Sequence, residues 1–223
     1  MNKKILVIAA HPDDELLGCG GVVALHTMNG DEVTSLIVCE GNSLRNASTN
    51  DVHQSQIFEA ATVLGVNDVR SLQFPDQKLE TFLLTELIDP ILEIVREIKP
   101  SIVYCQYGGD VNRDHKILFE AVLVATRPTE EYIEAVYAFD TASSTEWAYP
   151  RSFIPDTWID ITSVLDLKIL AMSKYVTELR DYPHPRSLRA LQNKAVAYGN
   201  QCLMEAAETF MTIRRTVRNA KLY

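Results

Sequence analysis

The sequence predicts an α/β fold in which helices cover both faces of a mostly parallel β-sheet. Apolar runs of strand length alternate with segments of helical apolar periodicity along the chain. The first run, residues 4–9, is apolar at every position after its lysine, as expected of a strand buried on both faces. No repeat, low-complexity tract or linker divides the 223 residues, so we expect a single domain over residues 1–223.

Four strands and three helices are predicted in the first half of the chain. The strands are expected at residues 4–9, 33–38, 69–74 and 101–106. The helices are expected at residues 16–28, 51–64 and 82–98, each followed by glycine or proline within two residues. Pro90 lies inside the third helix and predicts a kink there or a division into two helices.

The second half continues the alternation with longer loops. A polar loop at residues 107–115 leads into a helix that ends at Ala125. Strands are expected at residues 132–139 and 158–161, separated by a long loop at 141–155. Helices are expected at residues 164–179 and 188–215, and the prolines between them, in residues 182–187, predict a stiff connection.

The composition argues against several classes of partner. Lys and Arg total 21 against 30 Asp and Glu, which gives a formal net charge of −9, and no basic run is present, so nucleic acid and anionic membranes are not expected partners. No apolar run has transmembrane length, and residues 1–9 lack the features of a signal peptide. Four widely spaced cysteines, without a CxxC pair, favour reduced thiols and a cytoplasmic location: Cys19, Cys39, Cys105 and Cys202.

The densest group of chemically active residues follows the first predicted strand. His11, Asp13, Asp14 and Glu15 are crowded at its carboxyl end, the edge at which open α/β sheets bind ligands. Carboxylates packed this closely repel one another unless a cation lies among them. His11 and Asp14, three residues apart, are therefore expected to bind one metal ion. Asp13 remains available to move a proton.

A second polar cluster follows the fourth predicted strand and ends in His115. If the first and fourth strands are neighbours, His115 supplies a third ligand. A site of two histidines, one aspartate and an open position is typical of catalytic zinc. The simpler interpretation of Asp13 or Asp14, a helix N-cap, requires one such residue and leaves the rest of the cluster unexplained.

The same region admits two other interpretations. Gly18-Cys19-Gly20-Gly21 suggests a dinucleotide site, but the turn after the strand holds carboxylates that would repel a pyrophosphate, so we expect these glycines to let a helix pack closely on the sheet. The acidic turn also suggests a receiver-like, magnesium-binding signalling domain. That alternative needs a phosphoacceptor aspartate at the end of the third strand, where only Asp76 is loosely compatible.

The remaining candidates have plainer interpretations. His26 is expected to be structural, and His53 to cap a helix or face solvent. Tyr175 has the spacing of a core residue. His184, held between two prolines, is equally compatible with an active-site role and with a structural one. Glu146 lies in the long loop, where functional residues are common.

Six stretches of the chain together resemble a known enzyme family. These stretches are Ala10-His11-Pro12-Asp13-Asp14-Glu15, Gly18-Cys19-Gly20-Gly21, Asp110-Val111-Asn112-Arg113-Asp114-His115, Ala125-Thr126-Arg127-Pro128, Ser144-Thr145-Glu146-Trp147 and Tyr182-Pro183-His184-Pro185-Arg186-Ser187. With them the sequence resembles the PIG-L/LmbE-like family of zinc-dependent N-acetylglucosaminyl deacetylases.

The resemblance implies a Rossmann-like three-layer sandwich and a reaction. It implies Zn²⁺, or another divalent metal, on His11, Asp14 and His115, with Asp13 as general base. The implied substrate is a small N-acetylated sugar or sugar conjugate, with a non-sugar amide as the alternative. The chain departs from many members at two places: Asn112 stands where they have a histidine, and His53 and Gln56 stand where they have an arginine and a glutamate.

These departures lead to predictions about the remaining site residues. We predict that His184 takes the role of the missing histidine, stabilising the tetrahedral intermediate and protonating the leaving nitrogen; the competing view is that Asn112 and the metal suffice. A homo-oligomer is compatible with the sequence. Substrate contacts are expected from Arg45, Asn112, Arg113, Arg127, Glu146 and Arg186.

Overall fold

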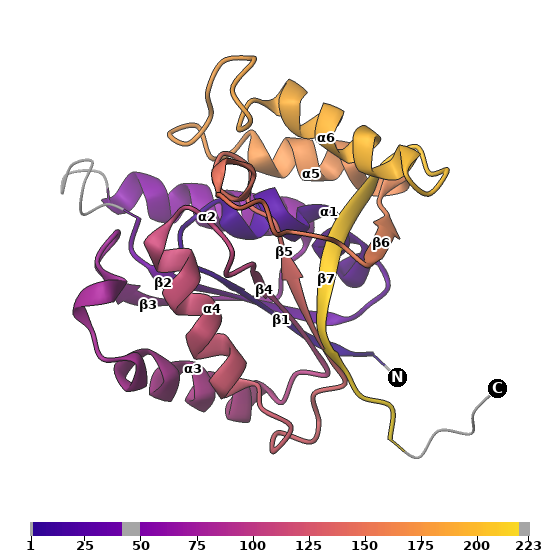
Figure 1. Ribbon diagram of the computed structural model, residues 1–223. Coiled ribbons are helices and arrows are strands. Elements are labelled where there is room, and N and C mark those ends of the chain that lie inside the picture. The colour runs from indigo at the N-terminus through magenta and orange to yellow at the C-terminus, as the bar shows by residue number, and fades with distance from the viewer. Residues whose placement is uncertain (1, 42–49, 219–223) are drawn as a thin grey trace.

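The computed structural model describes residues 2–41 and 50–218 (Figure 1). One sheet holds seven strands in the order β3-β2-β1-β4-β5-β7-β6. The strands are β1 (Lys4–Ala9), β2 (Glu32–Cys39), β3 (Asp68–Phe74), β4 (Ile102–Gln106), β5 (Ala135–Phe139), β6 (Thr157–Asp160) and β7 (Ala207–Arg215). The strands β1 to β5 pair in parallel, and β7 runs antiparallel to both of its neighbours.

Helices form a layer on each face of the sheet. One layer contains α1 (Asp14–Met28), α2 (Asn50–Leu64), α5 (Leu165–Met172) and α6 (Leu188–Asn200), and the other contains α3 (Leu84–Ile98) and α4 (Arg113–Ala125) (Figure 1). Short 3₁₀ helices lie at Leu79–Thr81, Thr145–Trp147 and Thr162–Val164. The predicted α/β fold with a mostly parallel sheet between helices is confirmed.

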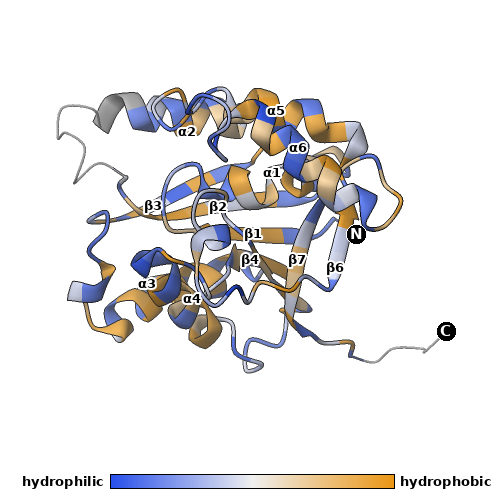
Figure 2. Cartoon of the chain, turned by 45° about the horizontal axis from the view of Figure 1, so that its top comes forward, coloured by the Kyte–Doolittle hydropathy of each residue, from blue (hydrophilic) through white to orange (hydrophobic). Residues whose placement is uncertain are grey.

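The central strand β1 contributes to both apolar cores. Ile5 and Val7 pack into the core under α1 and α5, whereas Leu6 and Ile8 pack into the core under α3 and α4. This alternation follows from the two-residue period of a strand, and it explains why the run is apolar at every position. Figure 2 shows apolar residues, in orange, on the strands and on the helices of both layers.

The glycines of α1 serve close packing, as predicted. A Cβ on Gly18 would lie 2.0 Å from Phe139 Cδ2 on β5, and one on Gly21 would lie 2.8 Å from Ile161 Cγ2. Between these two contacts the helix is interrupted at Cys19, whose φ and ψ are −140° and 20°. A larger residue at Gly18 would push the helix off the sheet, and one at Gly21 would clash with Ile161, which follows β6.

The interruption in α1 is held by a buried ion pair. The Glu208 carboxylate accepts from the backbone N–H groups of Gly21 and Val22 at 2.8 and 2.7 Å. Lys168 Nζ donates to Glu208 Oε1 at 2.6 Å and to the Leu17 carbonyl oxygen at 3.1 Å. The pair therefore binds the groups on both sides of the break.

The prediction of a helix over residues 188–215 is wrong after Asn200. Residues 207–215 form β7, which is hydrogen-bonded to β5 on one side and β6 on the other. Thr209, Phe210, Thr212 and Ile213 favour a strand, and pairing on both edges outweighs the helical apolar spacing.

Other boundaries also differ from the prediction. The helix expected at 164–179 ends at Met172 and continues as turns, and the strand expected from residue 132 begins at Ala135. The helix α3 passes through Pro90 as one continuous element. None of the helices within the described ranges has the length and apolar character needed to cross a bilayer.

The strand order determines where a ligand can bind. From β1 the chain builds outward to β2 and β3, then returns to place β4 on the other side of β1. The register pairs Ile8 on β1 with Cys105 on β4. In open α/β sheets such a reversal opens a crevice at the carboxyl ends of the two strands. The polar clusters after β1 and β4 both emerge at this point.

Candidate metal centre

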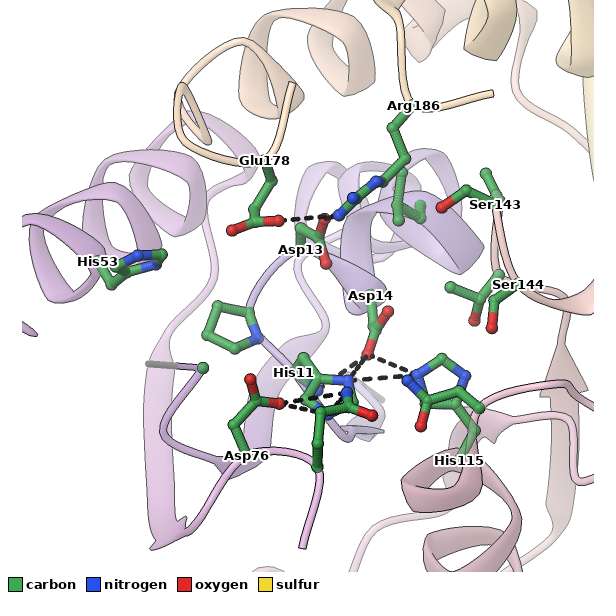
Figure 3. Close-up of a pocket in the computed structure, with 17 residues that line it drawn as sticks. His11, Asp13, Asp14, His53, Asp76, His115, Ser143, Ser144, Glu178 and Arg186 are labelled. Atoms are coloured by element: carbon green, nitrogen blue, oxygen red, sulfur yellow. Dashed lines mark hydrogen bonds and ion pairs between the residues drawn. The ribbon is translucent and has the colours of Figure 1, made fainter. Parts of the chain in front are cut away.

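Three side chains from the two clusters converge at the reversal point (Figure 3). His11 Nδ1 lies 3.2 Å from Asp14 Oδ2, and His115 Nε2 lies 3.3 Å from the same oxygen. The two imidazole nitrogens are 3.3 Å apart. His11 follows β1, Asp14 begins α1, and His115 lies in the first turn of α4. One metal ion could be bound by all three atoms.

Each histidine also contacts a carboxylate through its other ring nitrogen. His115 Nδ1 lies 3.2 Å from Asp110 Oδ2, and His11 Nε2 lies 2.9 Å from Asp76 Oδ1 and 3.1 Å from Asp114 Oδ2. Metal-binding histidines usually have such partners, which fix the ring and its tautomer. The contacts leave His11 Nδ1 and His115 Nε2 as the nitrogens that face Asp14.

The charge around the site suits a cation. Burial lowers the pKa of His11, but contacts with Asp114, Asp14 and Asp76 outweigh it and raise that pKa well above the usual value. Burial would raise the pKa of Asp14, but His115 and His11 hold it well below its usual range. The group is also rich in acidic residues. Among the described residues, six carboxyl groups line the pocket or contact its histidines, against the single arginine Arg186: Asp13, Asp14, Asp76, Asp110, Asp114 and Glu178.

A second group of donors, His11, Cys39 and Asp114, has a different role. Asp114 Oδ2 accepts from the Gln77 backbone N–H at 2.8 Å, and Oδ1 accepts from that of Leu79 at 3.1 Å. The Cys39 thiol lies 3.7 Å from Asp114 Oδ2. Because backbone amides already satisfy this carboxylate, we assign it to fixing the loop after β3 and the His11 ring. The metal candidate is the group of His11, Asp14 and His115.

Asp13 lies beside this group without joining it. Its side chain is buried, and Oδ2 is 3.4 Å from Arg186 Nη1, which also donates to Glu178 Oε2 at 2.8 Å (Figure 3). Burial raises the pKa of Asp13 well above its usual value, and the charges of Asp14 and Glu178 add to the effect, while Arg186 opposes it.

Two of the predicted substrate contacts line the pocket. Arg186 lies over Asp13, and its Nε is buried without a hydrogen-bond partner among the described residues. Asn112 caps α4, because its side-chain oxygen accepts from the Asp114 backbone N–H at 2.8 Å. Its amide nitrogen is left to donate to a ligand.

Other predicted contacts lie away from the pocket lining. Arg113 is 69% exposed and pairs with Glu80 at 3.3 Å. Arg127 follows the far end of α4, about 20 Å from its first turn at 1.5 Å per residue. Glu146 accepts from the backbone N–H groups of Ser143 and Ser144, and thereby shapes the loop that brings these serines to the pocket. Arg45 lies outside the described residues.

His184 is close to the pocket without lining it. Its Nδ1 accepts from the Arg186 backbone N–H at 3.1 Å, and its ring meets Trp147 edge-on with 6.0 Å between centroids. Burial, followed by Arg186 and Arg180, lowers the pKa of His184. The imidazole thus supports the segment that carries Arg186.

The sequence interpretation missed His53 as a pocket residue. His53 is 3% exposed, lines the pocket, and has an Nδ1 without a hydrogen-bond partner among the described residues. The signal was present in the spacing, since His53, Ile57, Ala60 and Leu64 share the buried face of α2. Asp76, Glu178, Ser143 and Ser144 also line the pocket and were not predicted.

The fold and the site define an α/β protein with a candidate catalytic metal centre at the ends of β1 and β4. A family model described as PIG-L, GlcNAc-PI de-N-acetylase, matches residues 6–126. The chain belongs to the PIG-L family. The predicted family is therefore confirmed, and the receiver-like alternative is not supported.

Curated relatives of this chain are mostly named as deacetylases. A probable N-acetyl-alpha-D-glucosaminyl L-malate deacetylase 2 of Bacillus cereus is 28% identical over 188 residues, covering 78% of this chain and 83% of the relative. The diacetylchitobiose deacetylase of Thermococcus kodakarensis is 25% identical, covering 79% and 70%. A 4-oxalmesaconate hydratase of Pseudomonas putida is 26% identical, covering 76% and 72%.

Solved structures share the fold along the whole chain. The conserved protein TT1542 of Thermus thermophilus superposes with a TM-score of 0.82 at 21% identity, covering 99% of each chain.

Proposed function

We propose that this protein is a metal-dependent amide hydrolase that removes the acetyl group from an N-acetylated amino sugar or its conjugate. The observation that carries the proposal is the convergence of His11 Nδ1, Asp14 Oδ2 and His115 Nε2 within 3.3 Å of one another. Two imidazoles and one carboxylate in a pocket open to a ligand are the donor set of catalytic zinc sites. Zinc is the expected ion, with another divalent transition metal as the alternative.

The hydrolysis divides into roles for the ion and for the protein. The ion, when bound, would polarise the amide carbonyl and lower the pKa of water. Asp13, which is not one of the three ligands, takes the proton of the attacking water and returns it to the leaving nitrogen. Arg186, at 3.4 Å, keeps the Asp13 carboxylate turned toward the pocket.

Three polar groups in the pocket are available to bind the substrate. Arg186 Nε and His53 Nδ1 are buried without partners among the described residues, so each gains a hydrogen bond when a ligand oxygen or hydroxyl reaches it. The Asn112 amide can donate to the amide oxygen of the substrate, where negative charge develops. A sugar, with hydroxyls around its ring, provides matching groups at these positions.

The sequence predicts that His184 takes the role of the missing histidine, with Asn112 and the metal as the competing view. The contact of His184 with the Arg186 backbone and the lowered pKa of His184 favour the alternative in which Asn112 and the metal suffice. We therefore assign His184 to holding the Arg186 segment. A His184→Ala variant should retain metal and keep both limbs of the pH–rate profile, and loss of one limb would restore the proton-donor assignment.

The substrate class is supported by the family and by the names of the relatives. A test incubates the zinc-loaded protein with N-acetylglucosamine, diacetylchitobiose and N-acetylglucosaminyl L-malate, and measures acetate and the free amine. Metal content is determined on the same sample. Release from at least one sugar, with none from an acetyl-lysine peptide, is expected. Deacetylation of the peptide alone would mean that the substrate is a non-sugar amide.

The hydratase among the relatives supplies a second arm for this experiment. Hydration of 4-oxalmesaconate without acetate release from any sugar would overturn the proposed hydrolysis while leaving the metal site intact. A cytoplasmic location and a homo-oligomeric state remain predictions.

A further inference from the structure

Asp13 has a backbone conformation that its neighbours must impose. Its φ of 100° and ψ of −29° are left-handed, a region that favours glycine. A non-glycine residue persists there only when surrounding contacts outweigh the cost, and such residues cluster at functional sites. The contacts that fix Asp13 therefore bear on its proposed role as general base.

The Asp13 backbone is held by a carboxylate two residues later. The Asp13 N–H donates to Glu15 Oε2 at 3.1 Å, and the Asp13 carbonyl accepts from Leu16 and Leu17 in the first turn of α1. The other carboxylate oxygen, Glu15 Oε1, accepts from the Tyr175 hydroxyl at 2.6 Å. One buried carboxylate thus connects Tyr175 to the backbone of Asp13.

The Tyr175 hydroxyl gives the Glu15 carboxylate a fixed position. Tyr175 is fully buried in the apolar core beside α5, and Glu15 is 8% exposed. A buried carboxylate without partners would be costly, and these two hydrogen bonds satisfy both of its oxygens. The Tyr175 ring is held rigidly in the core, so the packing around a residue 160 positions later fixes the Glu15 carboxylate.

This arrangement frees the Asp13 side chain for chemistry. An aspartate immediately before a helix usually caps the first turn with its own carboxylate. Asp13 makes no such cap, and its carboxylate points instead into the pocket toward Arg186 (Figure 3). The backbone is anchored through Glu15, and the side chain, which is not used as a helix cap, contacts Arg186 instead.

We propose that Glu15 and Tyr175 are positioning residues for Asp13, holding its backbone left-handed so that its carboxylate faces the pocket. The inference rests on the proposed function, in which Asp13 moves the proton. It gives a functional role to Glu15 and Tyr175, which are not among the proposed metal ligands and do not line the pocket.

The first test removes only the Tyr175 hydroxyl. Tyr175→Phe keeps the ring and its packing, and loss of one hydrogen bond to a carboxylate is expected to lower kcat about tenfold with KM within twofold and metal content unchanged. Tyr132→Phe is the matched control, because Tyr132 also donates to a carboxylate, Glu130 Oε2, at 2.7 Å, outside the pocket. Equal kcat in the two variants would overturn the proposal.

The second test uses the acid and checks for rescue. Glu15→Gln can still accept from the Asp13 N–H, and its amide can donate to the Tyr175 oxygen, so it should keep more of kcat than Glu15→Met, which has similar length and no polar group. If the two variants are equally active, the hydrogen bonds that join Tyr175, Glu15 and Asp13 have no part in turnover. These variants also stand in if Tyr175→Phe does not fold.

The failure of this inference can be distinguished from failure of the proposed function. Suppose that the wild type releases acetate and Asp13→Asn does not. A Tyr175→Phe variant with the kcat of the wild type then refutes the positioning role of Glu15 and Tyr175 and leaves the proposed function intact. If the wild type releases no acetate, crystal structures of Tyr175→Phe and Glu15→Met still test whether Glu15 and Tyr175 fix the conformation of Asp13. We expect Asp13 to leave the left-handed region or to move away from Arg186 in Glu15→Met, and an unchanged Asp13 would overturn the proposal.

Discussion

Replacing Asp110 by asparagine should weaken metal binding without altering any of the three proposed ligands. Asp110 Oδ2 lies 3.2 Å from His115 Nδ1, the nitrogen opposite the one that faces Asp14. A carboxylate there accepts the Nδ1 proton and leaves Nε2 with the lone pair that a metal needs. The native contact thus selects the metal-binding tautomer.

The surroundings of Asp110 determine how an asparagine would sit. Asp110 Oδ1 accepts from the Asn112 backbone N–H at 2.8 Å, so the carbonyl oxygen of an asparagine must stay there. Its NH₂ group would then face His115 and favour the tautomer protonated on Nε2. Loss of such a partner usually costs ten- to a hundredfold in metal affinity, or about 1.4–2.7 kcal/mol. Asp110 is 1% exposed, so water cannot replace it, and we expect the upper part of that range.

The measurement is a zinc titration against a chromophoric chelator, with a thermal melt of the metal-free protein to show that the fold is retained. Asp31→Asn is the matched control, since Asp31 Oδ2 contacts His26 Nδ1 at 2.7 Å outside the pocket. Its zinc affinity should equal that of the wild type. An Asp110→Asn affinity within twofold of wild type would refute the tautomer argument.

Three further predictions test other parts of the structure. Asp13→Asn should keep its metal and lose turnover by about 10²–10⁴-fold, and metal loss or a near-normal rate would contradict its role as general base. His53→Leu should raise KM about tenfold with kcat within twofold, as expected for one lost hydrogen bond, and His53→Asn should do so less; an unchanged KM would exclude a substrate contact. Lys168→Met should lower the free energy of unfolding by about 3–5 kcal/mol, because Glu208 stays buried without its cation. Lys3→Met, which breaks an exposed pair with Glu134, should lower it by less than about 1 kcal/mol. Chemical denaturation measures both values, and equal values would contradict the role of the buried pair.

The residues of the metal centre could be predicted because their signals are local. His11 and Asp14 are three residues apart directly after a strand, and His115 follows another apolar run. Predicting that the three side chains converge required one assumption about topology, namely that β1 and β4 are neighbours. The pairing of Ile8 with Cys105 confirms that assumption.

The C-terminal strand could not be predicted by the same reasoning. Residues 207–215 carry apolar residues at spacings that suit a helix or a strand. The choice depends on two partner strands, β5 and β6, whose paired residues lie 47 to 80 positions earlier. Local periodicity gives no information about such pairing. His53 is a different case, because its spacing with Ile57, Ala60 and Leu64 is a local signal for the buried face of α2.

The position of Asp13 shows why the site needs tertiary contacts that no motif contains. From the sequence alone the simplest interpretation of an aspartate before a helix is an N-cap, and Tyr175, 160 residues after Glu15, is a core residue. In the structure the tyrosine fills the core and its hydroxyl also orients Glu15, whose other oxygen holds the backbone of Asp13. The left-handed turn then directs one carboxylate toward the pocket while its neighbour, Asp14, faces the two histidines. Two adjacent aspartates can have different roles only because the backbone between them is fixed, and the groups that fix it lie outside the pocket.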